Sequence, residues 1–266
     1  MSKFKLGLGA LLAAVMLIGI GQIFSPAAAG TLEDVKARGK LLAGVRFDSP
    51  PYGSIDANGK NVGFDIDLAK EFAKRLGVEI EFVQVTGKTR IPMLESGKVD
   101  LLVAATTHTR KRDEVVDFSI PYLTDGQRLM VRKGSGIEGV ADLAGKKVTT
   151  VQGSTNEAKI KEVAPEANLV VYQEYPQAFL AFKQGLAEVF TTTVLILDQF
   201  DEEGDDFEIV GPFLSVEPIA VGVRENDSDW LDTINAMLQD MANDSTFETI
   251  WKSHFEFAVQ QVPMWP

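Results

Sequence analysis

The stretch GFDIDLAKEFAKRL, residues 63–76, lies between two short apolar segments, LLAGVRF at 41–47 and EIEFVQV at 79–85. Apolar residues recur in it every four positions, at Phe64, Leu68, Phe72 and Leu76. This spacing predicts an amphipathic helix, and the short apolar segment on each side predicts a strand. Strand, helix and strand in this order build a parallel sheet whose faces are covered by helices.

The same alternation continues along the chain and restarts after Leu129. Further strands are predicted at 101–105, 148–152, 169–172, 189–192 and 219–223. Further helices are predicted at 91–95, 156–163, 177–184, 229–241 and 246–255. Two such stretches, one on each side of Leu129, predict an α/β protein with two lobes rather than one long sheet.

Composition excludes several classes of function. The 266 residues carry 38 acidic and 26 basic side chains, a formal net charge of −12, and no cysteine. The acidic balance argues against nucleic acid as a partner, because such binding needs a positive field. Without cysteine there are no disulfides, thiolate metal sites or Cys nucleophiles. The two histidines lack metal-ligand spacing and no Gly-x-Ser-x-Gly motif occurs, so we expect no metal, cofactor or catalytic residue.

Residues 1–29 have the pattern of a cleaved signal peptide. Lys3 and Lys5 precede an uncharged apolar stretch at 6–20, and small residues in an Ala-x-Ala pattern follow at 25–29. The alternative is a transmembrane anchor, since the apolar stretch is almost long enough to span a bilayer. No cysteine follows it, so a lipoprotein is not expected. The predicted mature chain begins near Gly30, has a net charge of −14 after loss of both lysines, and is exported to a bacterial periplasm.

Three arginines stand where predicted strands end or just beyond them. Arg46 ends the first strand, Arg90 follows the second, and Arg112 follows the strand at 101–105. Ligands of open α/β sheets bind beyond the carboxyl ends of the strands. A guanidinium matches a carboxylate with two parallel hydrogen bonds, so these residues predict an anion site. The alternative for each is a surface arginine paired with a nearby acid.

In the second half, the sequence QGSTNE at 152–157 runs from a strand through a glycine to a helix. The hydroxyls of Ser154 and Thr155, with free N–H groups at the helix N-terminus, can hold an anion. It is not a phosphate-binding P-loop, because the Gly-x-x-x-x-Gly-Lys spacing is missing. The alternative is simple N-capping of the helix by one of these hydroxyls.

Several motifs occur in register along the mature chain. They are residues 63–71, Arg112-x4-Asp117-Phe118-Ser119-x-Pro121-Tyr122, Gln152-Gly153-Ser154-Thr155 and Gly185-x2-Glu188-Val189. With them the chain resembles the periplasmic amino-acid-binding proteins of polar amino-acid ABC importers, most closely the aspartate/glutamate-binding members. The resemblance implies a two-lobed clamp of the type II periplasmic-binding-protein kind, each lobe a mostly parallel sheet flanked by helices, joined by a two-strand hinge. Lobe 1 would be 30–127 plus 220–266, and lobe 2 would be 128–219.

The resemblance also implies roles for individual residues. Arg112 matches the arginine that holds the ligand's α-carboxylate, with Thr107 as an assisting hydroxyl and Ala105 as a backbone contact. Thr155, next to Ser154, matches the second lobe's hydroxyl donor to the same carboxylate.

The residues expected at the ligand's side chain favour an acidic ligand. Arg46 and Arg90 fall where aspartate/glutamate-binding members place arginines for the side-chain carboxylate. A cationic ligand such as arginine or lysine would face like charge here.

One position departs from the family pattern. Thr193 stands where the family usually has an aspartate that binds the ligand's ammonium group. A threonine hydroxyl accepts a hydrogen bond but brings no charge, and charge-assisted bonds are about twice as strong. Either another acid takes over, with Asp48 and Asp125 as candidates, or the ligand is an amine-free dicarboxylate.

The predicted function is therefore a non-catalytic, monomeric solute-binding protein that delivers glutamate or aspartate to a membrane ABC permease. One alternative is an enzyme on the same clamp, because residues 118–126, FSIPYLTDG, resemble exported cyclohexadienyl dehydratases. Such an enzyme needs a positioned proton donor in the cleft. Another alternative is a ligand-sensing partner of a chemoreceptor or histidine kinase.

Overall fold

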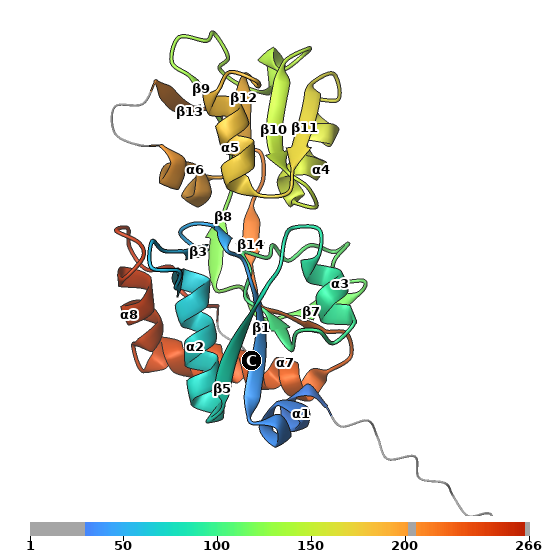
Figure 1. Cartoon of the computed structure of the whole chain (residues 1–266), viewed down its shortest axis with the longest axis vertical. Coiled ribbons are helices and arrows are strands. Elements are labelled where there is room, and N and C mark those ends of the chain that lie inside the picture. Colours follow the sequence, from blue (N-terminus) through green and yellow to red (C-terminus); the bar gives the residue numbers. More distant parts are fainter. Residues whose placement is uncertain (1–29, 202–205, 264–266) are drawn as a thin grey trace, which may run out of the picture.

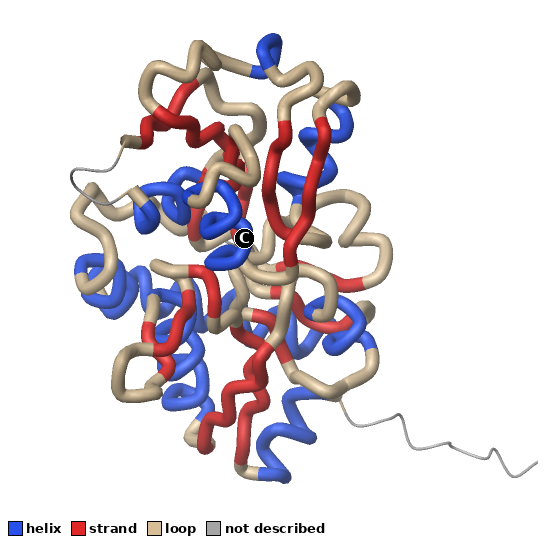
Figure 2. Tube along the Cα trace, turned by 45° about the horizontal axis from the view of Figure 1, so that its top comes forward, coloured by secondary structure: helices blue, strands red, loops and turns tan. Residues whose placement is uncertain are grey.

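A computed structural model describes residues 30–201 and 206–263, so the predicted signal peptide lies outside the described residues. Two lobes lie one above the other in Figure 1, each built around one five-stranded sheet. Helices flank the strands in both lobes (Figure 2). Within the described part of the chain, no helix is long and apolar enough to cross a membrane. The predicted two-lobed α/β clamp is confirmed.

The first sheet has the strand order β5-β1-β6-β15-β7. Its strands are β1 (Lys40–Val45), β5 (Glu79–Gln84), β6 (Leu101–Leu102), β7 (Val116–Phe118) and β15 (Gly222–Arg224). Strand β1 pairs in parallel with β5 and β6, whereas β15 runs antiparallel to β6 and β7. The helices of this lobe are α1 (Thr31–Arg38), α2 (Phe64–Leu76), α3 (Arg90–Glu95), α7 (Ser228–Asn243) and α8 (Thr246–Lys252).

Helix α2 forms where its four-residue spacing predicts it. Phe64, Leu68 and Phe72 are fully buried on its inner face, and each such side chain stabilises the fold by about 1.5–3 kcal/mol. The helix ends at Gly77, whose φ of 70° is left-handed and favours glycine. The Phe64 ring meets the ring of Trp251 edge to face at 5.7 Å, which fixes the C-terminal helix α8 against α2.

The second sheet has the order β11-β10-β12-β9-β13. Its strands are β9 (Gln127–Arg132), β10 (Lys147–Val151), β11 (Asn168–Tyr172), β12 (Val189–Thr193) and β13 (Phe207–Val210). The helices are α4 (Thr155–Val163), α5 (Tyr175–Lys183) and α6 (Val194–Phe200), with a 3-10 turn at Val140–Asp142. Strand β10 is parallel to β11 and β12, so loops after these strands meet at one edge.

Two short antiparallel strands, β8 (Leu123–Asp125) and β14 (Glu217–Ile219), connect the lobes as the hinge (Figure 1). A smaller sheet of β2 (Asp48–Ser49), β3 (Gly53–Ile55) and β4 (Asn61–Val62) lies in the first lobe. The exact lobe boundaries at 127/128 and 219/220 stay a prediction.

Two predicted strands are wrong in extent. The predicted strand at 219–223 is divided between β14 and β15, because the chain pairs first with β8 in the hinge and then with β6 and β7. The predicted strand at 101–105 pairs as β6 only over its first two residues, and its last residue, Ala105, has a left-handed φ of 47°. A change of pairing partner or of backbone direction leaves the apolar pattern intact, so the pattern cannot locate it.

Candidate ligand-binding site

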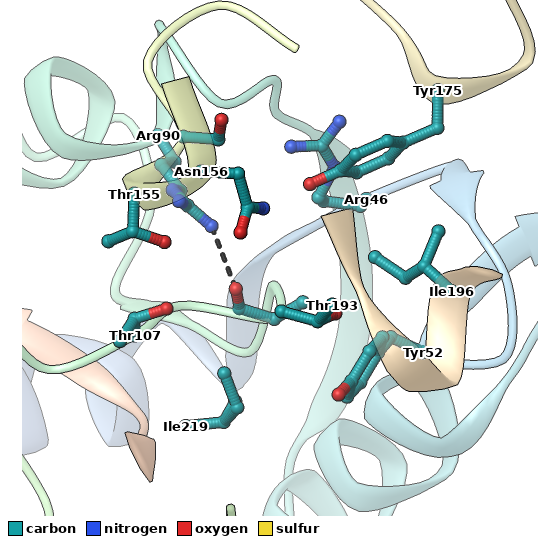
Figure 3. Close-up of a pocket in the computed structure, with 12 residues that line it drawn as sticks. Arg46, Tyr52, Arg90, Thr107, Thr155, Asn156, Tyr175, Thr193, Ile196 and Ile219 are labelled. Carbon is teal, nitrogen blue, oxygen red and sulfur yellow. Dashed lines mark hydrogen bonds between the residues drawn. The ribbon is translucent and has the colours of Figure 1, made fainter. Parts of the chain in front are cut away.

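A small cavity lies between the two lobes (Figure 3). Its lining residues are Arg46, Tyr52, Arg90, Ala105, Thr107, Ser154, Thr155, Asn156, Tyr175, Thr193, Ile196 and Ile219. All the predicted site residues except Arg112 are among them. They come together because they follow, or end, strands β1, β5, β6, β10 and β12, whose carboxyl ends face the cleft.

Sequence reasoning missed five lining residues. These are Tyr52, Asn156, Tyr175, Ile196 and Ile219. Asn156 and Tyr175 follow strands just as the predicted residues do, so the same rule applied to every strand end would have found them. Nothing in the sequence marks Tyr52, which reaches the cavity from the loop between β2 and β3.

Arg46 is buried, and its charge is already neutralised. Its Nε and Nη2 donate to the Asp48 carboxylate at 2.9 and 2.6 Å. The guanidinium also lies 4.9 Å from the centre of the Tyr175 ring. Burial lowers the pKa of Arg46, but the adjacent Asp48 carboxylate outweighs it and leaves the pKa raised. Arg46 can therefore offer Nη1 to a ligand but little net charge.

Arg90 is buried without such a partner. Its Nη1 donates to the carbonyls of Ala104 and Ala105 at 2.9 and 3.0 Å. The dashed line from Arg90 in Figure 3 marks one of these bonds. Its Nε lacks a hydrogen-bond partner, and no carboxylate forms an ion pair with it among residues 30–201 and 206–263. Burial, followed by the charges of Arg112 and Arg46, lowers the pKa of Arg90 well below its usual value. A buried cation of this kind favours an anionic ligand.

The backbone that anchors Arg90 is held in place by Asp65. This carboxylate accepts the N–H of Ala105 at 2.7 Å and the hydroxyl of Tyr122 at 2.8 Å. Both bonds fix the left-handed peptide at Ala105, whose carbonyl receives Arg90. Burial raises the pKa of Asp65 to about 7, although these hydrogen bonds and the charge of Arg90 oppose the rise.

Arg112 lies beside the cavity rather than in it. It lines a wider groove between the lobes, which shares Thr107, Ser154 and Thr155 with the cavity. Its Nη1 donates to the Thr107 carbonyl at 2.7 Å, and its Nη2 donates to the Gly153 carbonyl of the other lobe at 3.2 Å. The role of Arg112 at the α-carboxylate stays a prediction.

The hydroxyls at the start of α4 are already engaged. Ser154 accepts the N–H of Glu157 at 3.1 Å, so the N-cap alternative describes it correctly. Thr155 donates its hydroxyl to Glu217 at 2.8 Å. A ligand carboxylate at this position would therefore meet backbone N–H groups of α4, while the Thr155 oxygen remains an acceptor.

Neither acid considered as a substitute at the ammonium site lines the cavity. Asp48 is bound by Arg46 and by the backbone N–H of Tyr175. Asp125 accepts the hydroxyl of Tyr52 at 2.9 Å and the N–H of Gly126 at 2.7 Å. Burial raises the pKa of Asp125 despite these bonds.

Comparison with known protein families matches residues 41–257 to the bacterial extracellular solute-binding proteins, family 3. The chain belongs to this family. Among curated relatives, the ABC transporter glutamine-binding protein GlnH of Bacillus subtilis is 38% identical over 260 residues, 94% of this chain and 95% of that protein. The predicted family is thereby confirmed at the level of amino-acid-binding proteins of ABC importers.

Solved structures agree with this family 3 assignment. A mutant of ArgBP from T. maritima is 34% identical with a TM-score of 0.82, covering 85% of this chain and 100% of that one. An ancestral amino acid-binding protein, described as a precursor of cyclohexadienyl dehydratase, is 34% identical with a TM-score of 0.80 over the same shares. Both likenesses extend over the two lobes and the hinge.

The two lobes of this family 3 protein touch at Gly87. A Cβ built on Gly87 would lie 2.5 Å from the carbonyl oxygen of Gln152, which belongs to the opposite lobe. Only glycine therefore allows this close approach. The cleft in the described structure is closed, because Arg112 also donates across it to Gly153.

We expect Gly87→Ala to weaken ligand binding about tenfold, because an overpacked contact costs about 1–3 kcal/mol and is felt only when the lobes close. Titration followed by intrinsic tryptophan fluorescence measures the affinity. Gly139→Ala is the matched control, since its Cβ meets nothing within 4 Å. Equal affinities of the two variants would show that closure does not bring Gly87 against Gln152.

Proposed function

We propose that this chain captures an acidic amino acid, glutamate or aspartate, outside the cytoplasm and delivers it to a membrane ABC permease. The observation that carries the proposal is Arg90, a buried cation in the cavity that forms no ion pair within the described residues. A buried charge is stabilised by an opposite charge in contact with it, and the ligand is the group that can supply one.

The charges around the cavity support an anion over a cation. Arg46 and Asp48 cancel each other, and the cavity lining contains no acidic side chain in the described chain. The side chain of a lysine or arginine ligand would place a second cation beside Arg90 and find no carboxylate, which strongly disfavours it. The named relatives bind glutamine or arginine, so we expect a change of specificity within the same clamp.

The proposed location is the periplasm, with an ABC permease as partner and the protein acting as a monomer. The predicted signal peptide at 1–29 supports export. The name of the B. subtilis relative as a component of an ABC transporter supports the partner.

A thermal-shift screen of amino acids and dicarboxylates tests the ligand. A ligand that binds only the folded protein, at 100 times its Kd, adds about 2.7 kcal/mol to the free energy of unfolding. We expect glutamate or aspartate to raise the Tm and lysine and arginine to leave it unchanged. A Tm rise with lysine or arginine, but not with glutamate or aspartate, would overturn the acidic-ligand proposal.

An amine-free dicarboxylate is the second candidate, and Thr193 favours it. Thr193 lines the cavity, whereas Asp48 and Asp125 lie outside the lining, and Asp125 reaches it only through a hydrogen bond to the Thr193 side chain. Succinate and glutarate belong in the same screen for this reason. A response to these compounds alone identifies the second candidate.

The dehydratase alternative has less support. The cavity lining in the described chain holds no carboxylic acid or histidine to act as a proton donor, although one solved relative is described as a precursor of such an enzyme. Incubation with prephenate, followed by detection of phenylpyruvate, is the direct assay, and we expect no product.

A further inference from the structure

A buried carboxylate, Glu217, lies beside the candidate site and has no role in the resemblance. Glu217 begins the hinge strand β14 and is 2% exposed. Its carboxylate accepts two hydroxyl groups, Thr155 Oγ1 at 2.8 Å and Ser215 Oγ at 2.5 Å. No lysine, arginine or histidine within 30–201 and 206–263 forms an ion pair with it. A buried carboxylate without a cation has an unmet need for positive charge.

Arg112 is the complementary case on the same groove. It is half-buried, and its guanidinium donates to the main-chain oxygens of Thr107 and Gly153. Its backbone N–H donates to the carbonyl and the hydroxyl of Thr109. Within the described chain, Arg112 forms no ion pair. Burial lowers the pKa of Arg112, and the charge of Glu217 opposes this most strongly. Arg112 and Glu217 line the same groove, so the two charges lie near each other without forming an ion pair.

The head group of an α-amino acid carries an ammonium and a carboxylate on one carbon atom, so it can satisfy two opposite charges that lie near each other. We propose that Glu217 holds the α-ammonium group of the ligand, in place of the acid expected at position 193. This inference rests on the proposed function. The Thr155 hydroxyl donates to Glu217, so its lone pairs are free to accept a hydrogen from the same ammonium.

The positions of the cavity and the groove are consistent with this placement of the ligand's head group. Thr107, Ser154 and Thr155 line both the cavity and the groove, so they mark the passage between them. An amino-acid head group in this passage reaches Arg112 and Glu217 on the groove side. Its side chain then extends into the cavity towards Arg90.

The charge balance matches an acidic amino acid. Arg46 cancels Asp48, and Arg112 balances Glu217, which leaves the single positive charge of Arg90. Glutamate and aspartate carry one net negative charge at neutral pH. An amine-free dicarboxylate carries two and has no ammonium group to offer Glu217.

Calorimetric titration of the mature protein, residues 30–266, with L-glutamate and with glutarate tests the proposal. Glutarate has the same carbon chain without the amine, so the ratio of the two affinities measures recognition of the ammonium. We expect Glu217→Gln to reduce this ratio about 10- to 100-fold, because a hydrogen bond to a charged group contributes about 1.5–3 kcal/mol. The glutamine oxygen can still accept one of the two hydroxyls, of Thr155 or Ser215, while its NH2 group faces the other. The Tm without ligand reports whether the fold is retained.

Asp125→Asn tests the competing acid, because the Asp125 carboxylate is hydrogen-bonded to Thr193 in the cavity lining. Asp125 pairs with Glu217 across the two hinge strands, and its replacement by asparagine removes one negative charge, as Glu217→Gln does. We expect Asp125→Asn to leave the ratio unchanged; a reduced ratio in this variant alone would assign the ammonium to Asp125 instead. An unchanged ratio in Glu217→Gln, or equal affinity of the wild type for both compounds, overturns the inference while the acidic site stands. Failure of the wild type to bind glutamate, glutarate and also aspartate overturns the proposed function.

Discussion

Replacement of Arg90 by glutamine is expected to lower the affinity for an acidic ligand by at least about 100-fold. Removal of one partner of a buried ion pair costs about 3–5 kcal/mol, and Arg90 has no other carboxylate to pair with in the described chain. Calorimetric titration with glutamate and aspartate measures the loss.

The same substitution should raise the Tm of the ligand-free protein. Arg90 is a buried cation whose pKa is lowered first by burial, so its removal relieves an electrostatic penalty on the folded state. Arg46→Gln is the matched control with the opposite sign, because it leaves the buried Asp48 carboxylate without its cation and should lower the Tm. Unaltered affinity in Arg90→Gln would show that the ligand's anion lies elsewhere.

The contrast between Arg46 and Arg90 shows how far the sequence could predict this site. The periodicity at 63–76 and the apolar segments around it predict a parallel α/β sheet, and a parallel sheet brings the ends of its strands to one edge. Local sequence patterns therefore predict which residues lie at the cleft. Whether a cation there is free depends on its neighbours in space. Arg46 forms an ion pair with Asp48 two residues away, while no acid in the described part of the chain forms one with Arg90.

Glu217 lies beyond what the sequence could predict. It precedes the predicted strand at 219–223, and a single acid before an apolar segment is too common a pattern to select. The hinge brings it to Thr155, 62 residues away in the chain. The division of that predicted strand into β14 and β15 has the same origin, since both depend on where the chain leaves the hinge for the sheet.

Replacement of Arg112 by alanine is expected to abolish the ligand-dependent rise in Tm, through a loss of affinity of about 100-fold or more. A guanidinium binds a carboxylate with two charge-assisted hydrogen bonds, and alanine offers none. The substitution also removes the bond from Arg112 to Gly153, which joins the two lobes across the cleft. Loss of ligand contact and loss of closure therefore act in the same direction. Thermal shift with glutamate or aspartate at millimolar concentration measures the effect.

Arg110→Ala is the matched control for this prediction. Arg110 precedes Arg112 by two residues in the same loop and is exposed, so its removal changes the net charge equally without touching the cleft. We expect a normal Tm rise in this variant, since exposed charges contribute little at physiological salt. Arg112→Lys separates charge from shape, because lysine keeps the charge but not the fork and should recover only part of the affinity. Full affinity in Arg112→Ala would mean that the ligand's α-carboxylate is bound elsewhere, and the N-terminus of α4 would then be the remaining site for it.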